Sequence, residues 1–256
     1  MTDISRKIMS APSPRTPRTV YAYVDGFNLY HRVLENHTRR KWLNLWALIQ
    51  SRFPNDTIAR VRFFTAPVDD RHPASEKRMR QETYWRVLRD SGVEIEPGRI
   101  EGRERKCKAD SCGKYLSFVH PTEKMSDVSL ALRIVTDAID APPGIVCVVS
   151  ADLDVLPALK ILKERGIKSR RCLFLPGGDP AHYFSRLENF GGIASIGQIT
   201  GLDVENFQFP ASFLLKSGHL LAKPEVDPEN WTGRIVNANS AHRSPCQRND
   251  VSIVPI

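Results

Sequence analysis

The sequence is poor in cysteine and has no long apolar run. It has five cysteines, an odd number without repeated spacing, so a framework of paired disulfides is not indicated. The N-terminal residues are polar and lack the apolar core of a secretory signal, and no apolar stretch approaches the length of a membrane span. We find no internal repeat, which excludes solenoids and propellers. We therefore expect reduced thiols, a cytoplasmic compartment and no membrane contact.

The remaining composition is that of an ordinary globular protein. Hydrophobic residues make up 41% and charged residues 26% of the 256 positions. This length allows one large domain, or a domain with extensions. Lys and Arg number 37 against 29 Asp and Glu, which gives a net charge of +8. The excess favours a polyanionic partner, nucleic acid first, although many soluble proteins are basic for no specific reason.

Apolar strand-like runs alternate with amphipathic segments along the chain. This order predicts an α/β fold with a central, mostly parallel sheet and flanking helices. After about residue 201 the pattern weakens, and we expect one hairpin in a C-terminal extension. On the helices, Met79 and Ile139 are expected to face the core and Asp137 to face solvent. The expected strands are residues 19–24, 58–65, 93–96, 144–149 and 167–175, and the expected helices are 42–49, 73–90, 128–140, 157–165 and 181–189.

Carboxylates stand at three junctions between these elements. Asp25 ends the first strand, Asp127 opens the helix at 128–140, and Asp152 and Asp154 follow the strand at 144–149. Taken singly, each could be a turn former or a helix cap. The carboxyl ends of parallel strands share one edge of a sheet, where open α/β folds carry their sites. We therefore expect these acids to converge at that edge.

A cluster of like charges is unfavourable unless a cation compensates it. Hard oxygen ligands at an open site suit Mg²⁺ or Mn²⁺, so we expect one of these cofactors, with Asp25, Asp127 and Asp152 as ligands. Such a metal can activate a bound water and orient a phosphodiester. Asn28 is placed to hydrogen-bond the Asp25 carboxylate or a ligand.

Basic residues lie in segments outside the expected core. Arg39 and Arg40, and Arg103 and Arg105, are candidates for contacts with phosphate groups, while an ordinary surface loop is the simpler reading for the first pair. In residues 107–120, Cys107, Cys112 and His120 could bind zinc, although the spacing is unusual and a clear fourth ligand is missing. The same region could instead be a basic hairpin that grips a nucleic-acid backbone, or a surface hairpin without a role.

Three motifs together resemble the NYN domain family, a PIN-like group of ribonucleases related to the LabA-like proteins. The motifs are residues 23–29 (YVDGFNL), residues 123–128 (EKMSDV), and residues 150–154 (SADLD) with Pro157. The resemblance covers about residues 19–200. It implies a three-layer Rossmann-like PIN fold and metal-dependent cleavage of RNA.

The resemblance also implies roles for individual residues. It makes Asp25, Asp127 and Asp152 the acidic centre and Asp154 an outer acid. Asn28 and Ser150 would position groups nearby, and Lys124 of the second motif is a candidate substrate contact. Leu153 and Val155 depart from the hydroxyl and aromatic residues usual in the family's third motif.

The sequence thus predicts a Mg²⁺- or Mn²⁺-dependent endoribonuclease, a hydrolase acting on single-stranded RNA. The departures at Leu153 and Val155 motivate the alternative of a non-catalytic RNA-binding or regulatory NYN module, and a small-molecule phosphohydrolase is a third hypothesis. Homo-oligomerisation is left open. The expected organisation is a disordered basic arm (1–18), the NYN/PIN-like domain (19–200), a wrapping extension (201–231) and a disordered tail (232–256).

Overall fold

The computed structural model describes residues 16–68, 76–106, 117–187 and 192–224. At its centre is a six-stranded sheet in the order β3-β2-β1-β6-β7-β8, and every neighbouring pair in it is parallel. This confirms the predicted α/β class with a parallel central sheet. The strands of the sheet are β1 (Thr19–Asp25), β2 (Thr57–Thr65), β3 (Val93–Pro97), β6 (Ile145–Val149), β7 (Arg170–Pro176) and β8 (Ser195–Ile199).

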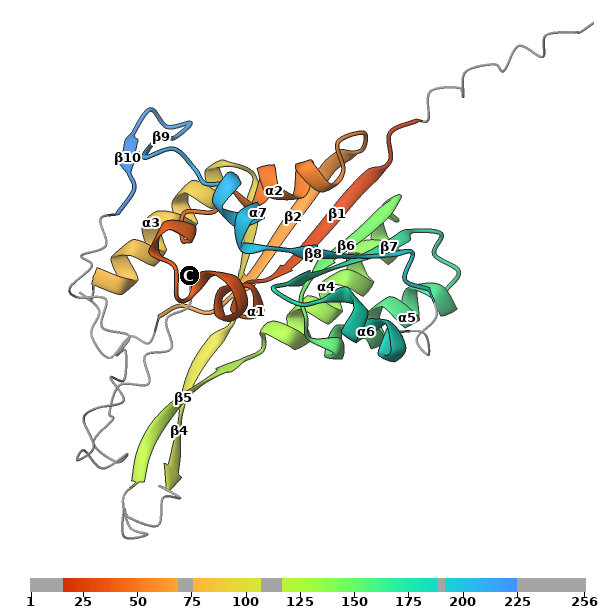
Figure 1. The fold of residues 1–256 in the computed structure, drawn as a ribbon, viewed down its shortest axis with the longest axis horizontal. Helices are drawn as coiled ribbons and strands as arrows, with labels where there is room; N and C mark the ends of the chain where they lie inside the picture. The colour runs from red at the N-terminus through yellow and green to blue at the C-terminus, as the bar shows by residue number, and fades with distance from the viewer. Residues whose placement is uncertain (1–15, 69–75, 107–116, 188–191, 225–256) are drawn as a thin grey trace, which may run out of the picture.

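Helices cover both faces of this sheet, which gives three layers (Figure 1). One apolar cluster packs the sheet against α1 (Gly26–Leu29), the π-helix η1 (Tyr30–Leu34), α2 (Leu45–Arg52), α3 (Glu76–Asp90) and α7 (Gly201–Asn206). The other packs it against α4 (Ser126–Asp140), α5 (Leu156–Glu164) and α6 (Pro180–Leu187). Two 3₁₀ turns, η2 (Thr38–Arg40) and η4 (Leu153–Val155), complete the connections.

The inner strand β6 is apolar throughout because both of its faces are covered. Every residue of β6, Ile145–Val149, is buried, as expected for an inner strand of a parallel sheet. Cys147 of β6 and Cys172 of β7 are register partners, and both are free and buried. The prediction that these two thiols pack inside strands is confirmed.

The strand order reverses between β1 and β6. From β1 the chain moves outward through β2 and β3, and it then returns to build β6, β7 and β8 on the other side. In open α/β sheets, the crevice at the carboxyl ends of two such strands is where ligands bind. Asp25 ends β1 and Ser150 follows β6, so both residues lie at this switch point.

Several sequence expectations were wrong in detail. The strand β8 was not predicted, because its sequence, SIGQI, is short and partly polar. By contrast, the hairpin expected after residue 201 was predicted correctly. It is formed by β9 (Ser212–Leu214) and β10 (Leu220–Ala222). Met79 and Ile139 are 54% and 52% exposed rather than turned into the core. Asp137, expected on a solvated face, is only 6% exposed.

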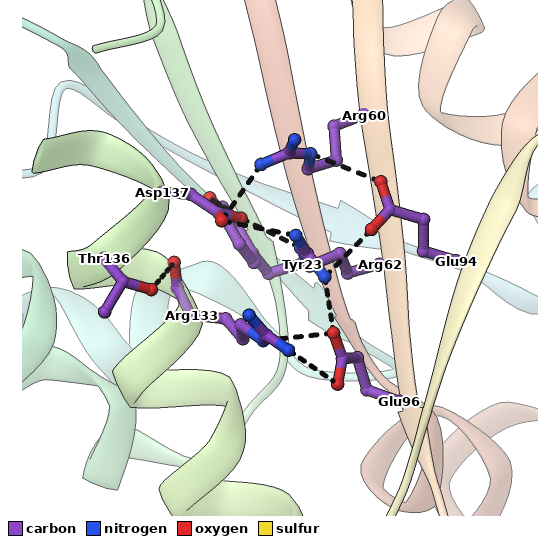
Figure 2. A network of polar contacts seen from close by, with 8 residues as sticks. All are labelled: Tyr23, Arg60, Arg62, Glu94, Glu96, Arg133, Thr136 and Asp137. Carbon is purple, nitrogen blue, oxygen red and sulfur yellow. Dashed lines mark hydrogen bonds and ion pairs between the residues drawn. The ribbon is translucent and has the colours of Figure 1, made fainter. Parts of the chain in front are cut away.

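Asp137 is buried because cationic and hydroxyl partners surround it (Figure 2). Its carboxylate accepts hydrogen bonds from Tyr23 Oη at 3.1 Å and from Arg62 Nε at 2.9 Å. Arg60 Nη1 lies 2.9 Å from the same carboxylate. Arg62 also pairs with Glu94 and Glu96 of β3. These contacts fasten α4, whose first turn carries Asp127, to β1 and β2.

An antiparallel pair of strands, β4 (Arg99–Lys106) and β5 (Ser117–Lys124), links β3 to α4 and extends away from the body (Figure 1). It begins at the carboxyl-terminal ends of the strands, the side of the sheet where the switch point lies. The antiparallel pairing agrees with a hairpin at these residues, while zinc binding and contact with a nucleic-acid backbone stay predictions. Cys107 and Cys112, the proposed zinc ligands, lie outside the described residues, as do residues 1–15 and 225–256 of the predicted arm and tail.

No helix within the described ranges is long and apolar enough to cross a membrane.

Candidate functional site

Asp25 is the most deeply buried acid at the switch point. It is 6% exposed, and both of its carboxylate oxygens have partners. Oδ1 accepts a hydrogen bond from the backbone N–H of Asn28 at 2.9 Å, and Oδ2 accepts one from the Ser150 hydroxyl at 2.8 Å. The next residue is a glycine, Gly26. A Cβ at this position would lie 2.6 Å from the Phe63 ring and the Phe64 carbonyl, so no larger residue fits. Asp25 is thus both the N-cap of α1 and a link between β1 and β6.

The turn after β6 is tied to the turn after β1 by side chains of both. The Asn28 side-chain oxygen accepts a hydrogen bond from the backbone N–H of Ala151 at 3.0 Å. The Ser150 hydroxyl, while donating to Asp25, accepts from the backbone N–H of Asp152 at 2.9 Å. Asp152 in turn caps η4, because its Oδ1 accepts from the Asp154 N–H at 3.0 Å. The two loops therefore form one hydrogen-bonded unit.

The junction of β5 and α4 is the third part of the site, beside the turns after β1 and β6. Met125 has a left-handed backbone with φ +82° immediately before α4. That conformation costs roughly 1–2 kcal/mol for a residue with a Cβ, and such strain is concentrated at functional sites. The turn lets the buried Ser126 hydroxyl donate to the Glu123 carboxylate. Glu123 is thereby held beside Asp127.

Desolvation and mutual repulsion raise the pKa values of these acids. Burial raises the pKa of Asp25 to about 6, against the hydrogen bonds from Asn28 and Ser150, and Asp127 and Asp152 add to the increase. Burial, with smaller contributions from Asp25 and Asp127, raises the pKa of Glu123 to about 7. The pKa of Asp127 is raised by partial desolvation and by Asp152 and Asp154. The site therefore holds carboxyl groups that exchange protons near neutral pH.

Asp25→Asn is expected to stabilise the fold at alkaline pH. Since the pKa of Asp25 is 3.8 when unperturbed and about 6 in the fold, its stabilising contribution is full below pH 3.8 and is lost as the pH rises through about 6. At pH 8 the variant should be more stable than wild type by about 3 kcal/mol, and at pH 3.5 the two should be equal. Chemical denaturation at both pH values measures this, with Asp140→Asn, at an exposed position of α4, as control. A variant that is less stable than wild type at pH 8 would refute the hypothesis that the buried charge of Asp25 destabilises the fold.

The structure brings most of the predicted site residues together. Asp25, Asn28, Ser150 and Asp152 are joined by the hydrogen bonds above, and Asp127 lies within electrostatic range of the two acids among them. Asp154 is exposed at the rim, and Lys124 is exposed at the end of β5.

Of the basic residues predicted to contact phosphate groups, Arg40 makes structural contacts, and the role of the others is not tested. Arg40 is committed to structure, because its Nε contacts Glu205 of α7 at 2.8 Å and its Nη1 donates to the Val33 carbonyl. Arg39 is exposed on η2 beside it. Arg103 and Arg105 lie on β4, paired in register with His120 and Phe118.

Glu123 was missed as a site residue by sequence reasoning. It was seen only as part of a motif, because an acid on a strand gives no signal of its own. The signal that could have identified it is the serine three residues later, at the start of α4. That spacing lets a side-chain hydrogen bond bridge the strand end and the helix.

The predicted Mg²⁺ or Mn²⁺ centre is not supported. Within the described ranges no group of three or more His, Cys, Asp or Glu side chains is arranged to hold a metal ion. The physical reason is that groups of the surrounding loops engage the carboxylates of Asp25 and Asp152. Asp25 uses both oxygens for Asn28 and Ser150, and Asp152 uses one to cap η4. Asp25, Asp127 and Asp152 are close but do not form a set of metal ligands.

Comparison with known proteins points to another chemistry. No family model matches the sequence, and no solved structure matches it. The chain is 24% identical over 257 residues to the 6-hydroxy-3-succinoylpyridine 3-monooxygenase HspA of Pseudomonas putida. The alignment covers 85% of this chain and 77% of that protein, so the similarity extends over nearly the whole fold.

This similarity corrects the functional prediction. A monooxygenase is an oxidoreductase, so the prediction of a metal-dependent endoribonuclease, with its hydrolase class and its Mg²⁺ or Mn²⁺ cofactor, is wrong on this comparison. The alternative of a non-catalytic RNA-binding module falls with it, since the similar protein is named as an enzyme. The NYN resemblance, the RNA partner and homo-oligomerisation stay predictions that none of these findings tests.

Proposed function

We propose that this protein is an oxidoreductase that inserts oxygen into a small hydroxylated heteroaromatic compound. The observation that carries the proposal is the similarity to a monooxygenase over 85% of the chain. The name of that protein specifies a pyridine ring with a hydroxyl and an acyl substituent. The proposed reaction centre is the group of acids Asp25, Glu123 and Asp127 at the β1/β6 switch point.

The acids at the switch point suit proton transfer to and from a ring hydroxyl. Oxygen insertion into an electron-rich ring is assisted when the ring hydroxyl loses its proton, because the resulting oxyanion donates electrons to the ring. A general base works best when its pKa lies near the working pH. The pKa of Glu123 is raised to about 7, so its carboxylate can accept that proton. Asp25, with both oxygens bonded, positions the loops.

Oxygen insertion also requires electrons. One atom of O₂ enters the substrate and the other leaves as water, which consumes two electrons from a donor and two protons, at least one of them from solvent when the donor is a reduced nicotinamide. Reduced nicotinamides and flavins are the usual two-electron carriers. The turn after β1 does not fit the pyrophosphate of such a dinucleotide, because the sequence has no G-x-G-x-x-G run and the turn starts with the carboxylate of Asp25. We therefore assign no donor site at this turn.

The proposal is tested by oxygen consumption. Purified protein is supplied with 6-hydroxy-3-succinoylpyridine or other hydroxypyridines, O₂ and NADH or NADPH, with and without added flavin. We expect substrate-dependent uptake of O₂ and oxidation of the donor in a 1:1 ratio, as the stoichiometry of a two-electron donor requires. Donor oxidation without a hydroxylated product, or no uptake with any member of the series, would contradict the assignment.

Three further predictions accompany this function. The cytoplasmic compartment agrees with the free thiols of Cys147 and Cys172. The NYN-like domain agrees with the placement of Asp25, Asn28 and Ser150 in one hydrogen-bonded unit. RNA as a partner has only the net charge of +8 in its favour.

A further inference from the structure

A pocket lies at the amino-terminal ends of the sheet strands, on the side opposite to the acids. An open pocket of about 830 Å³ is formed where strands of the sheet begin. Arg18 directly precedes β1, Arg170 is the first residue of β7, and Arg52 ends α2. Since β1 has seven residues, the pocket and Asp25 are separated by roughly 20 Å. The pocket is therefore distinct from the proposed reaction centre.

The charge of this pocket favours an anion. Arg18, Arg52 and Arg170 line it, whereas the acid among its lining residues is Asp56. Asp56 is neutralised by Arg18, whose backbone N–H and Nε lie 2.9 Å and 3.5 Å from its Oδ1. Arg170 is exposed, and its side chain makes no ion pair with any described residue. One guanidinium is thus left to meet a ligand from solvent.

Arg52 supplies a second donor. Its Nη2 lies 2.6 Å from Asp203 Oδ1, which fixes the guanidinium against the protein. Its Nε, however, is buried and donates to no acceptor within the described part of the chain. A buried N–H without an acceptor is costly, so a shift of the Arg52 side chain that brings this N–H to a ligand oxygen in the pocket would be favoured.

Aromatic side chains form the apolar part of the pocket. Phe53 and Phe174 both line it, with ring centroids 5.9 Å apart in an edge-to-face arrangement. The Arg52 guanidinium lies 6.0 Å from the centroid of the Phe174 ring. A flat ring can pack on such a wall while an attached oxyanion meets the guanidinium groups. The volume lies within the usual range for small-molecule sites.

We propose that this pocket binds a phosphorylated small molecule with a planar ring, of the size of a nucleoside monophosphate. The phosphoryl group is held by the exposed guanidinium of Arg170 and by Arg52, whose side chain shifts to bring its buried Nε to the ligand, and the ring lies against Phe53 and Phe174. The site does not depend on the oxidoreductase proposal, because it uses other residues at the other edge of the sheet.

The test is isothermal titration calorimetry with AMP, adenosine and inorganic phosphate as probes. We expect saturable binding of AMP, binding of adenosine at least about tenfold weaker, and displacement of AMP by phosphate. Arg170→Gln should weaken AMP binding at least about tenfold without changing the melting temperature, because that side chain makes no ion pair among the described residues. Arg86→Gln, at an exposed position of α3, is the matched control and should bind as wild type.

The proposal is overturned by three results. These are no saturable binding of AMP, equal affinity for adenosine and AMP, and unchanged AMP binding in Arg170→Gln. Binding of an RNA oligonucleotide without binding of AMP would also overturn it, because the surface would then recognise a polymer backbone. None of these readouts involves oxygen consumption, so failure here leaves the oxidoreductase proposal to its own test.

Discussion

Arg62→Met will lower the free energy of unfolding by about 3–5 kcal/mol, the cost of leaving a buried charge without its partner. The side chains of Arg62 and Asp137, taken without their backbone, are 9% and 7% exposed, and Arg62 approaches the Asp137 carboxylate through Nε at 2.9 Å and Nη2 at 3.3 Å (Figure 2). Removal of the guanidinium leaves Asp137 with Tyr23 and the more exposed Arg60. Thermal unfolding should show a melting temperature on the order of 10 °C lower.

Arg133→Met is the matched control for this prediction. Arg133 pairs with Glu96 at 3.1 Å in the same network, but its side chain is 46% exposed. Its loss should therefore change stability by less than about 1 kcal/mol. A second substitution, Asp137→Asn, should recover part of the loss in Arg62→Met, since the uncompensated charge is then removed. Equal effects of Arg62→Met and Arg133→Met would show that burial of the pair does not determine its contribution.

Glu123→Gln will reduce the turnover number by about 10²–10⁴-fold, the range for loss of a general base. The carboxylate must be ionised to accept the proton of a ring hydroxyl. Because its pKa is raised to about 7, the rate of wild type should rise as the pH increases through about 7. In the variant that rise should disappear, while the remaining activity becomes flat with pH.

Two controls separate this role from a structural one. Glu164→Gln removes an exposed carboxylate at the end of α5 and should leave both rate and pH profile unchanged. The melting temperature of Glu123→Gln should not fall, because the wild-type carboxylate is already partly desolvated. If the turnover number drops but the rise near pH 7 persists, the titrating group lies elsewhere.

The fold was largely predictable from the sequence because its signals are local. The fully apolar run at Ile145–Val149 and the carboxylate of Asp25 at the end of a strand can both be recognised without knowing which strands pair. A β-α-β order with right-handed crossovers then leaves few arrangements. β8 was missed because its position depends on pairing with β7 rather than on its own composition.

The grouping of the acids was predictable from the sequence, but the contacts of each carboxylate were not. Three acids at one edge could be foreseen from strand polarity, whereas the direction of each carboxylate could not. That direction is set by contacts distant in sequence, such as Ser150 with Asp25. Asp137 illustrates the same limit, since its burial depends on Arg60 and Arg62, more than 70 residues earlier in the printed sequence.

Isotope incorporation from ¹⁸O₂ distinguishes a monooxygenase from a hydrolase. Wild-type protein, a hydroxypyridine substrate and an electron donor are incubated under ¹⁸O₂ in ordinary water, and in parallel under ¹⁶O₂ in H₂¹⁸O. We expect a product that carries one ¹⁸O atom from the gas and none from the solvent. A product labelled from water would show a hydrolytic reaction and would contradict the assignment to the monooxygenases.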